Sequence, residues 1–195
     1  MPKQKNMISG TQVINIPKES LVLMCAAPNS GKTAFTKKHF SKRKDVTLIC
    51  SDDLFRENAQ KASLFETYES VMKKTIITLE STVKNAVSNG HIVVIDAASH
   101  YLEQRLDMIK EFRSLFKNII LIVIDLDLPD LKRHGVKESI PILERFGMVA
   151  PNEEDTEVIS KFIKLQFLNG DIYKGVDTVF RVNSKSLNNC KVFIM

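Results

Sequence analysis

The sequence has no tryptophan and only three cysteines among its 195 residues. Cys25, Cys50 and Cys190 lie in or beside apolar runs, and none of them forms a C-x-x-C pair. This spacing argues against a disulfide framework and against a cysteine-based zinc site. We therefore expect a protein of a reducing, cytoplasmic compartment.

Long apolar segments are also missing. No apolar run approaches the roughly 20 residues that a membrane-spanning helix needs, and the polar residues 1–10 lack the apolar core of a signal peptide. There is no internal repeat and no low-complexity tract. With 44% hydrophobic and 26% charged residues, the composition predicts one soluble domain over 1–195, away from membranes, with 1–19 as an N-terminal extension or edge strand.

Acidic residues are outnumbered by basic ones, 23 to 28, which gives a formal net charge of +5. The pI is near 9.0. An excess of lysine suits an anionic partner such as nucleic acid. General solubility accounts for the same excess nearly as well.

Apolar runs typical of strands alternate with helical patterns along most of the chain. The strand-like runs cover 21–25, 46–50, 92–95 and 119–124, and the helical patterns cover 32–40, 65–88 and 102–116. This alternation predicts a parallel sheet with helices on both faces, which binds ligands at the carboxyl ends of its strands. The late runs 176–182 and 191–194 predict a terminal hairpin or a last pair of strands.

The first apolar run leads into a phosphate-binding pattern. Gly31, Lys32 and Thr33 match the end of G-x-x-x-x-G-K-[ST], in which backbone N–H groups and a helix N-terminus surround a phosphate. Lys32 is expected to reach the β- and γ-phosphates, and Thr33 to ligate Mg²⁺. The predicted nucleotide-binding residues are Ala27, Pro28, Asn29, Ser30, Gly31, Lys32, Thr33 and Ala34.

Two positions depart from the usual glycine pattern. Ala26 stands where the first glycine is expected, a change that adds one methyl group. Asn29 precedes Ser30-Gly31 where another glycine would be easiest, and asparagine accepts a left-handed backbone at modest cost. Both changes are compatible with a phosphate loop.

Carboxylates follow the next strands. Asp53 and Arg56 come just after the run 46–50, one helical turn apart if a helix starts there. A carboxylate there can accept a hydroxyl proton, and a guanidinium can hold a phosphate. The alternative is helix capping by Ser51 or Asp52, with Asp53 in a favourable first turn.

Asp96 ends the third strand-like run, at the place where a Walker-B acid holds Mg²⁺. A helix cap is the alternative. His100 is expected to be solvated or capping. Asp125 and Asp127, after the fourth run, are expected to satisfy loop backbone groups.

The segment from Leu131 to Phe146 is short, basic and interrupted by Pro141. This pattern predicts a mobile helical lid over about 129–150 that brings positive charge to phosphates. A solvated basic face is the alternative. The basic residues of the segment include Lys132, Arg133, Lys137 and Arg145.

Together these residues resemble the P-loop kinases of the polynucleotide 5′-kinase type, which are related to zeta toxins and small-metabolite kinases. The likeness runs from about Leu21 to Ile159. The loop 26–33 follows G-x-P-G-S-G-K-[ST] with two glycines replaced, 96–99 follows D-x-[ST]-N in part, and Asp53 with Arg56 matches the family's acid and arginine three residues apart.

The resemblance implies an α/β fold of the P-loop NTPase type with a basic lid, and transfer of the γ-phosphate of ATP with Mg²⁺. Asp53 would be the general base for a 5′-hydroxyl, Arg56 would hold the acceptor, and Arg133 would neutralise developing charge beside Lys32. The expected partners are ATP and a nucleic-acid 5′ end. A nucleotide or metabolite kinase, or an inactive nucleotide-binding regulator, remains open, as does the oligomeric state.

Overall fold

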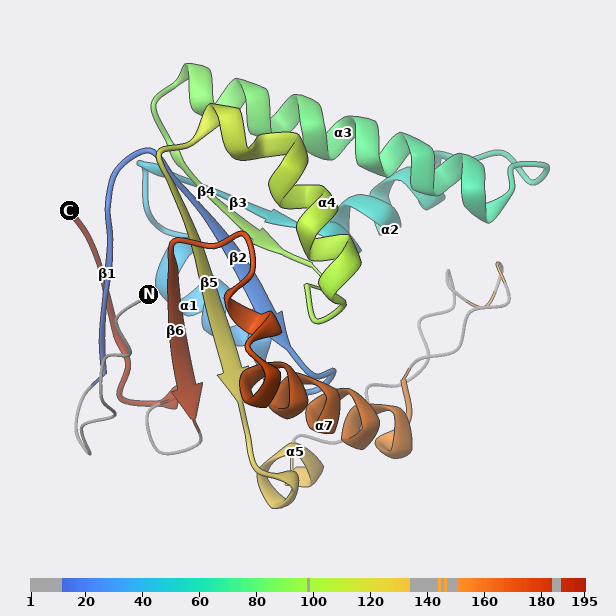
Figure 1. Cartoon of the computed structure of the whole chain (residues 1–195). Coiled ribbons are helices and arrows are strands. Elements are labelled where there is room, and N and C mark those ends of the chain that lie inside the picture. The colour runs from blue at the N-terminus through green and yellow to red at the C-terminus, as the bar shows by residue number, and fades with distance from the viewer. Residues whose placement is uncertain (1–11, 98, 134–143, 145, 147–150, 184–186) are drawn as a thin grey trace.

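The computed structural model describes residues 12–97, 99–133, 144, 146, 151–183 and 187–195 (Figure 1). Five parallel strands form the main sheet in the order β3-β4-β2-β5-β6. Their bounds are Val46–Cys50 for β3, Ile92–Asp96 for β4, Ser20–Ala26 for β2, Asn118–Asp125 for β5 and Thr178–Asn183 for β6.

The central strands are apolar because both of their faces are covered. Every residue of β2 is buried, and so is every residue of β5 after Asn118. Continuous apolar runs of this kind are typical of parallel strands between two helical layers. The predicted α/β sheet is therefore confirmed.

Helices connect the strands and flank the sheet (Figure 1). In chain order they are α1 (Lys32–Phe40), α2 (Ser51–Lys61), α3 (Tyr68–Ser88), α4 (Leu102–Phe112), α5 (Leu128–Arg133) and α7 (Glu153–Asn169), with short 3₁₀ turns at Arg113–Leu115 and Asp171–Tyr173. The chain moves from β2 to β3 in one direction and from β3 through β4 and β5 to β6 in the other. Right-handed crossovers therefore place α1 on the opposite face from α3, α4 and α7.

The strand register brings the carboxyl ends of all five strands to one edge of the sheet. Cys50 at the end of β3 lies beside Asp96 of β4, and Asp125 of β5 lies beside Asn183 of β6. Ala26 ends β2 between them, beside Ile124. The phosphate loop and the acidic strand ends therefore share one edge, as the sequence predicts.

The C-terminal part of the chain differs from the predicted hairpin. β6 joins the edge of the main sheet, whereas β7 (Lys191–Ile194) pairs in parallel with β1 (Val13–Ile16) in a separate sheet of two strands. The hairpin prediction is wrong because each late strand finds a partner far away in the sequence. Residues 13–16 form the strand β1.

Helix boundaries follow local caps more closely than apolar spacing. The predicted helix 65–88 begins at Tyr68, because the side chain of Thr67 caps it by accepting from the N–H of Ser70. The predicted helix 102–116 leaves the α-helical form after Phe112. Helix α7 was not predicted, although Asn152 and Asp155 form a capping box at its start.

The predicted lid lies mostly outside the described residues, and Lys137 and Arg145 are among those left out. Of the described part, α5 ends at Arg133. Phe146 packs its ring against Phe55 of α2 and Tyr68 of α3, with ring centroids 5.9 and 6.3 Å away. The C-terminal end of this segment thus contacts the helix that carries Asp53.

Within the described part of the chain, the helices are too short or too polar to cross a membrane.

Candidate functional site

The loop between β2 and α1 has the backbone of an anion-binding loop. Asn29 and Gly31 both adopt left-handed conformations, with φ of 59° and 79°. Gly31 caps α1 without a side-chain hydrogen bond, and the first turn of the helix holds no acidic residue. The first N–H groups of a helix have no intrahelical partners, so this N-terminus is suited to a phosphate.

Ser30 adds a second observation at the loop. Its hydroxyl is buried and has no hydrogen-bond partner among the described residues. Buried polar groups are seldom left without partners. A bound phosphate fits this loop, because it would accept from the helix N-terminus and from such a hydroxyl.

The left-handed backbone of Asn29 gives a testable prediction. Asn29→Gly is expected to preserve the loop, because glycine adopts this conformation without strain. Asn29→Val is expected to cost about 1–2 kcal/mol of unfolding free energy, because a β-branched residue resists it. Thermal unfolding and nucleotide titration of both variants check this. Equal behaviour of the glycine and valine variants would contradict the strained loop.

Asp96 lies at the centre of the site. Its side chain is fully buried at the end of β4, where it forms an ion pair with Lys32 and accepts a hydrogen bond from Thr36 Oγ1 at 3.2 Å. Asp96 does not cap α4, whose N-cap is Tyr101. The carboxylate is thus held against the phosphate loop, as a Walker-B acid would be.

Asp53 and Arg56 pair with each other on α2. Arg56 Nη1 donates to Asp53 Oδ1 at 2.7 Å, and both side chains are partly exposed. The N-cap of α2 is Cys50, without a side-chain hydrogen bond, so neither Ser51 nor Asp52 has the capping role that the sequence allowed. Asp53 is thus presented at the strand ends and is oriented by Arg56.

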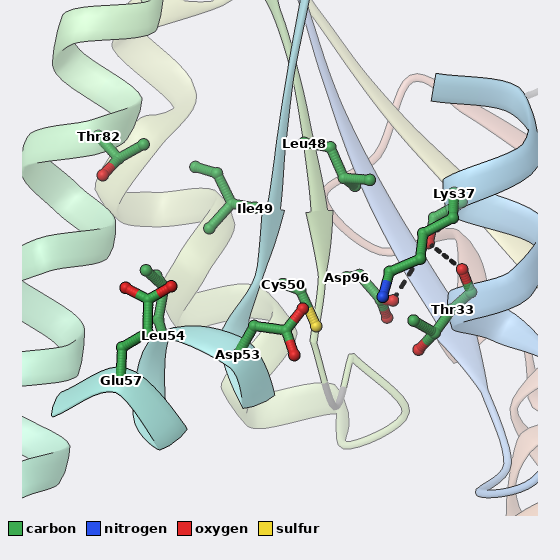
Figure 2. Close-up of a pocket in the computed structure, with 11 residues that line it drawn as sticks. Thr33, Lys37, Leu48, Ile49, Cys50, Asp53, Leu54, Glu57, Thr82 and Asp96 are labelled. Carbon is green, nitrogen blue, oxygen red and sulfur yellow. Dashed lines mark hydrogen bonds between the residues drawn. The ribbon is translucent and has the colours of Figure 1, made fainter. Parts of the chain in front are cut away.

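A pocket of about 260 Å³ brings three of the predicted site residues together. Thr33 and Asp96 line one end, and Asp53 lies opposite them (Figure 2). Glu57 and Lys37 also line this pocket, and Leu48 and Leu54 contribute apolar surface. Asp53 of α2 therefore faces the phosphate loop across a space that a small chemical group can enter.

The turn after β4 is held by buried side chains that the sequence did not reveal. Arg105 donates to Ser99 O at 2.9 Å, and Gln166 donates to His100 O at 2.7 Å. Arg105 also donates to Gln166 Oε1 at 2.9 Å. Isolated polar residues in amphipathic helices give no signal of this role, because their partners are distant in sequence.

His100 is buried, so the expectation of a solvated or capping histidine is wrong. Its ring packs on Tyr101 with centroids 4.2 Å apart. Burial, and then the charges of Lys32 and Arg105, lower the pKa of His100 to about 4. The imidazole is therefore neutral at physiological pH.

Asp125 has a side-chain partner where the sequence suggested loop backbone. Arg181 of β6 donates to Asp125 Oδ2 through Nε at 2.7 Å and also through Nη2. The same guanidinium lies over the ring of Phe167, 4.6 Å from its centroid. Asp127 is mostly exposed, with Lys164 Nζ 3.8 Å from Oδ1.

Arg133 and the metal ligands are the two other features of the predicted site. Arg133 ends α5, and its lid role stays a prediction. In the described ranges, no group of three or more histidine, cysteine, aspartate or glutamate side chains could hold a metal ion by itself. A metal at Thr33 and Asp96 would therefore need oxygen ligands from phosphate and water, which is the usual state of Mg²⁺.

A comparison with known protein families shows the family to which the chain belongs. The family described as chromatin associated protein KTI12 matches residues 20–157, which is more than half of the chain. The chain belongs to the KTI12 family. The matched residues include the phosphate loop, Asp53 with Arg56, Asp96 and the region of the predicted lid.

Solved structures show how this KTI12-family chain is built. A chain of the Pnkp1/Rnl/Hen1 RNA repair complex aligns with a TM-score of 0.59 and 20% identity, over 78% of this chain and 46% of that one. The chain thus spans less than half the length of that protein. A protein of the PezAT toxin-antitoxin system of Streptococcus pneumoniae aligns with a TM-score of 0.56 and 14% identity, over 92% of this chain and 72% of that one. The tunicamycin resistance protein of Deinococcus radiodurans aligns with a TM-score of 0.52 and 7% identity, over 88% of this chain and 92% of that one.

These similarities show the fold. The KTI12-family chain has the P-loop kinase fold of the polynucleotide kinase type, which confirms the resemblance seen in the sequence.

Proposed function

We propose that the chain is an ATP-dependent kinase that transfers the γ-phosphate of ATP to a hydroxyl, with the 5′-hydroxyl of a DNA or RNA strand as acceptor. The observation that supports this most directly is the pocket in which Asp53 faces Thr33 and Asp96. It places a candidate base opposite the loop that would hold the phosphates.

In this proposal the nucleotide phosphates lie at the N-terminus of α1, next to Lys32. Lys32 would exchange Asp96 for the β- and γ-phosphates, which attract its ammonium more strongly than one carboxylate. Thr33 and Asp96 are the residues that would hold Mg²⁺, whose chemistry here is to neutralise phosphate charge. Their hard oxygen donors fit that ion.

Asp53 would accept the proton of the attacking hydroxyl as its oxygen bonds to the γ-phosphorus and the bond to ADP breaks. Arg56 keeps the carboxylate pointed at the pocket through its hydrogen bond to Oδ1. Arg56 Nη1 is engaged by Asp53, so the predicted clamp on an acceptor phosphate would use the other donors of the guanidinium. Arg133 would bring charge to the transferring group from the lid.

A basic residue in the lining of the pocket supports a nucleic-acid acceptor. Lys37 lines the pocket one turn beyond Thr33. Together with the net charge of +5, this lysine suits a phosphodiester backbone. The likeness to a chain of an RNA repair complex agrees with this choice.

The acceptor class is tested by the salt dependence of the reaction. With γ-labelled ATP, the apparent affinity for a 5′-hydroxyl oligonucleotide is expected to fall with salt, with a log–log slope near −0.7 per phosphate contacted. Nucleosides and small metabolites are the matched acceptors, and their affinities should change far less. Label on small acceptors only would assign the site to a metabolite kinase. ATP binding without any transfer would favour a regulatory module.

A further inference from the structure

Arg105 is a buried cation with neutral partners. The residue is 0% exposed, and its guanidinium donates to Ser99 O at 2.9 Å, Gln166 Oε1 at 2.9 Å and Asp171 O at 3.1 Å. Its Nε is buried and makes no hydrogen bond within the described part of the chain. All three acceptors are amide oxygens, which carry no net charge.

No carboxylate among the described residues forms an ion pair with Arg105. Asp171 is the nearby acid, but its side chain is bound by Lys174 at 2.6 Å, and Arg105 contacts only its main-chain oxygen. Burial of a charge is costly, and it lowers the pKa of Arg105 although the charge of Asp171 opposes this shift. Buried charges are normally paired, so a retained unpaired one calls for an anion elsewhere.

The guanidinium of Arg105 lies against the turn that follows Asp96, because its Nη1 donates to Ser99 O. Cys25 lies at the end of β2, directly before the phosphate loop. Burial raises the pKa of its thiol to about 12, while Arg105 and Lys32 oppose this rise. Burial is the main cause that lowers the pKa of His100, and the charges of the same two cations lower it further. The charges of Arg105 and Lys32 therefore both act on Cys25, before the phosphate loop, and on His100, in the turn after β4.

We propose that Arg105 strengthens nucleotide binding from inside the core, because its positive charge, which forms no ion pair among the described residues, attracts the phosphates without touching them. Arg105 is thus a positioning and electrostatic residue, separate from Lys32, which makes the direct contact. The inference rests on the nucleotide binding that the proposed function assumes. It requires neither an acceptor nor catalysis.

The field of a buried charge has a recognisable signature. The attraction between the buried charge and the ligand grows with the number of phosphates, because each phosphate adds negative charge. It also persists at high salt, because mobile ions screen buried charges poorly. A purely structural role for Arg105 has neither property, since a misplaced turn would weaken all adenine nucleotides by a similar factor.

Gln166→Glu tests the proposal by adding a counter-charge. The new carboxylate would stand where Gln166 Oε1 already accepts from Arg105. We expect about tenfold weaker ATP binding, a smaller loss for ADP, and no change for adenosine, a pattern that 0.5 M salt leaves in place. Equilibrium titration with each ligand and thermal unfolding are the measurements.

Two matched variants separate charge from structure. Gln166→Leu also loses the hydrogen bond to His100 O but adds no charge, so it should shift ATP, ADP and adenosine equally. Gln104→Glu adds the same charge at an exposed position of α4 and should have little effect. Should Gln166→Glu fail to fold, Arg105→Met provides the same graded comparison by removing the cation.

The outcomes distinguish this inference from the proposed function. If the wild-type chain binds ATP and Gln166→Glu weakens all three ligands equally, or none, the inference is overturned and the kinase proposal stands. If the wild-type chain binds no nucleotide, both are overturned. Graded losses in Gln166→Glu, absent from Gln166→Leu, support the inference even if no acceptor is ever phosphorylated.

Discussion

Asp53→Asn is expected to lower kcat for phosphoryl transfer by about 10²–10⁴-fold, the usual contribution of a general base. ATP affinity should stay the same, because Asp53 lies across the pocket from the phosphate loop (Figure 2). Asparagine keeps the shape and an oxygen for Arg56 but does not take up a proton. Steady-state kinetics and nucleotide titration measure the two effects separately.

Asp52→Asn is the matched control for this variant. Asp52 is the neighbouring acid on α2, and it is exposed and outside the pocket lining. Its change should leave kcat within about twofold of wild type, because exposed charges act weakly through water. Asp53→Asn that folds but no longer binds ATP would refute the role of Asp53 as a base.

Lys32→Ala is expected to abolish nucleotide-dependent activity. Losing a cation that contacts the transferring phosphates costs about 10²–10³-fold in kcat, in addition to the loss of ATP affinity. The variant should also lose stability, on the order of 3 kcal/mol, because Asp96 would remain as a buried carboxylate without its cation. Urea unfolding and nucleotide titration measure the two losses.

A double variant separates the two losses. Lys32→Ala with Asp96→Asn removes both charges of the buried pair, so it should recover much of the stability and none of the activity. Lys38→Ala, at an exposed position of α1, is the control for removing a lysine from this helix. Transfer activity in the folded double variant would contradict the assignment of Lys32 to the phosphates.

The parts of the fold that local sequence determines were predictable. The run Leu21 to Cys25 is buried on both faces, and the left-handed backbone at Asn29 follows from the loop pattern. Asp53, Arg56 and Asp96 could be nominated because carboxyl ends of parallel strands converge on one edge. Their positions around one pocket needed the structure, because β3, β4 and α1 are separate in sequence.

What sequence reasoning missed depends on distant contacts. β7 pairs with β1 at the other end of the chain, and no local pattern distinguishes that from a hairpin with β6. Arg105 and Gln166 are 61 positions apart and meet only in the core. His100 looked solvated because a single polar residue after a strand usually is. Here Gln166 holds its carbonyl and Tyr101 covers its ring.

The most direct test of the central claim is the fate of the γ-phosphate. The wild-type chain is incubated with γ-labelled ATP, Mg²⁺ and a 5′-hydroxyl oligonucleotide, with Asp53→Asn in parallel, and the labelled product is identified. The proposal predicts label as a 5′-terminal phosphate on the strand, lost in the variant. Label that stays in ATP or appears only as inorganic phosphate, although the wild-type chain binds ATP, would contradict it.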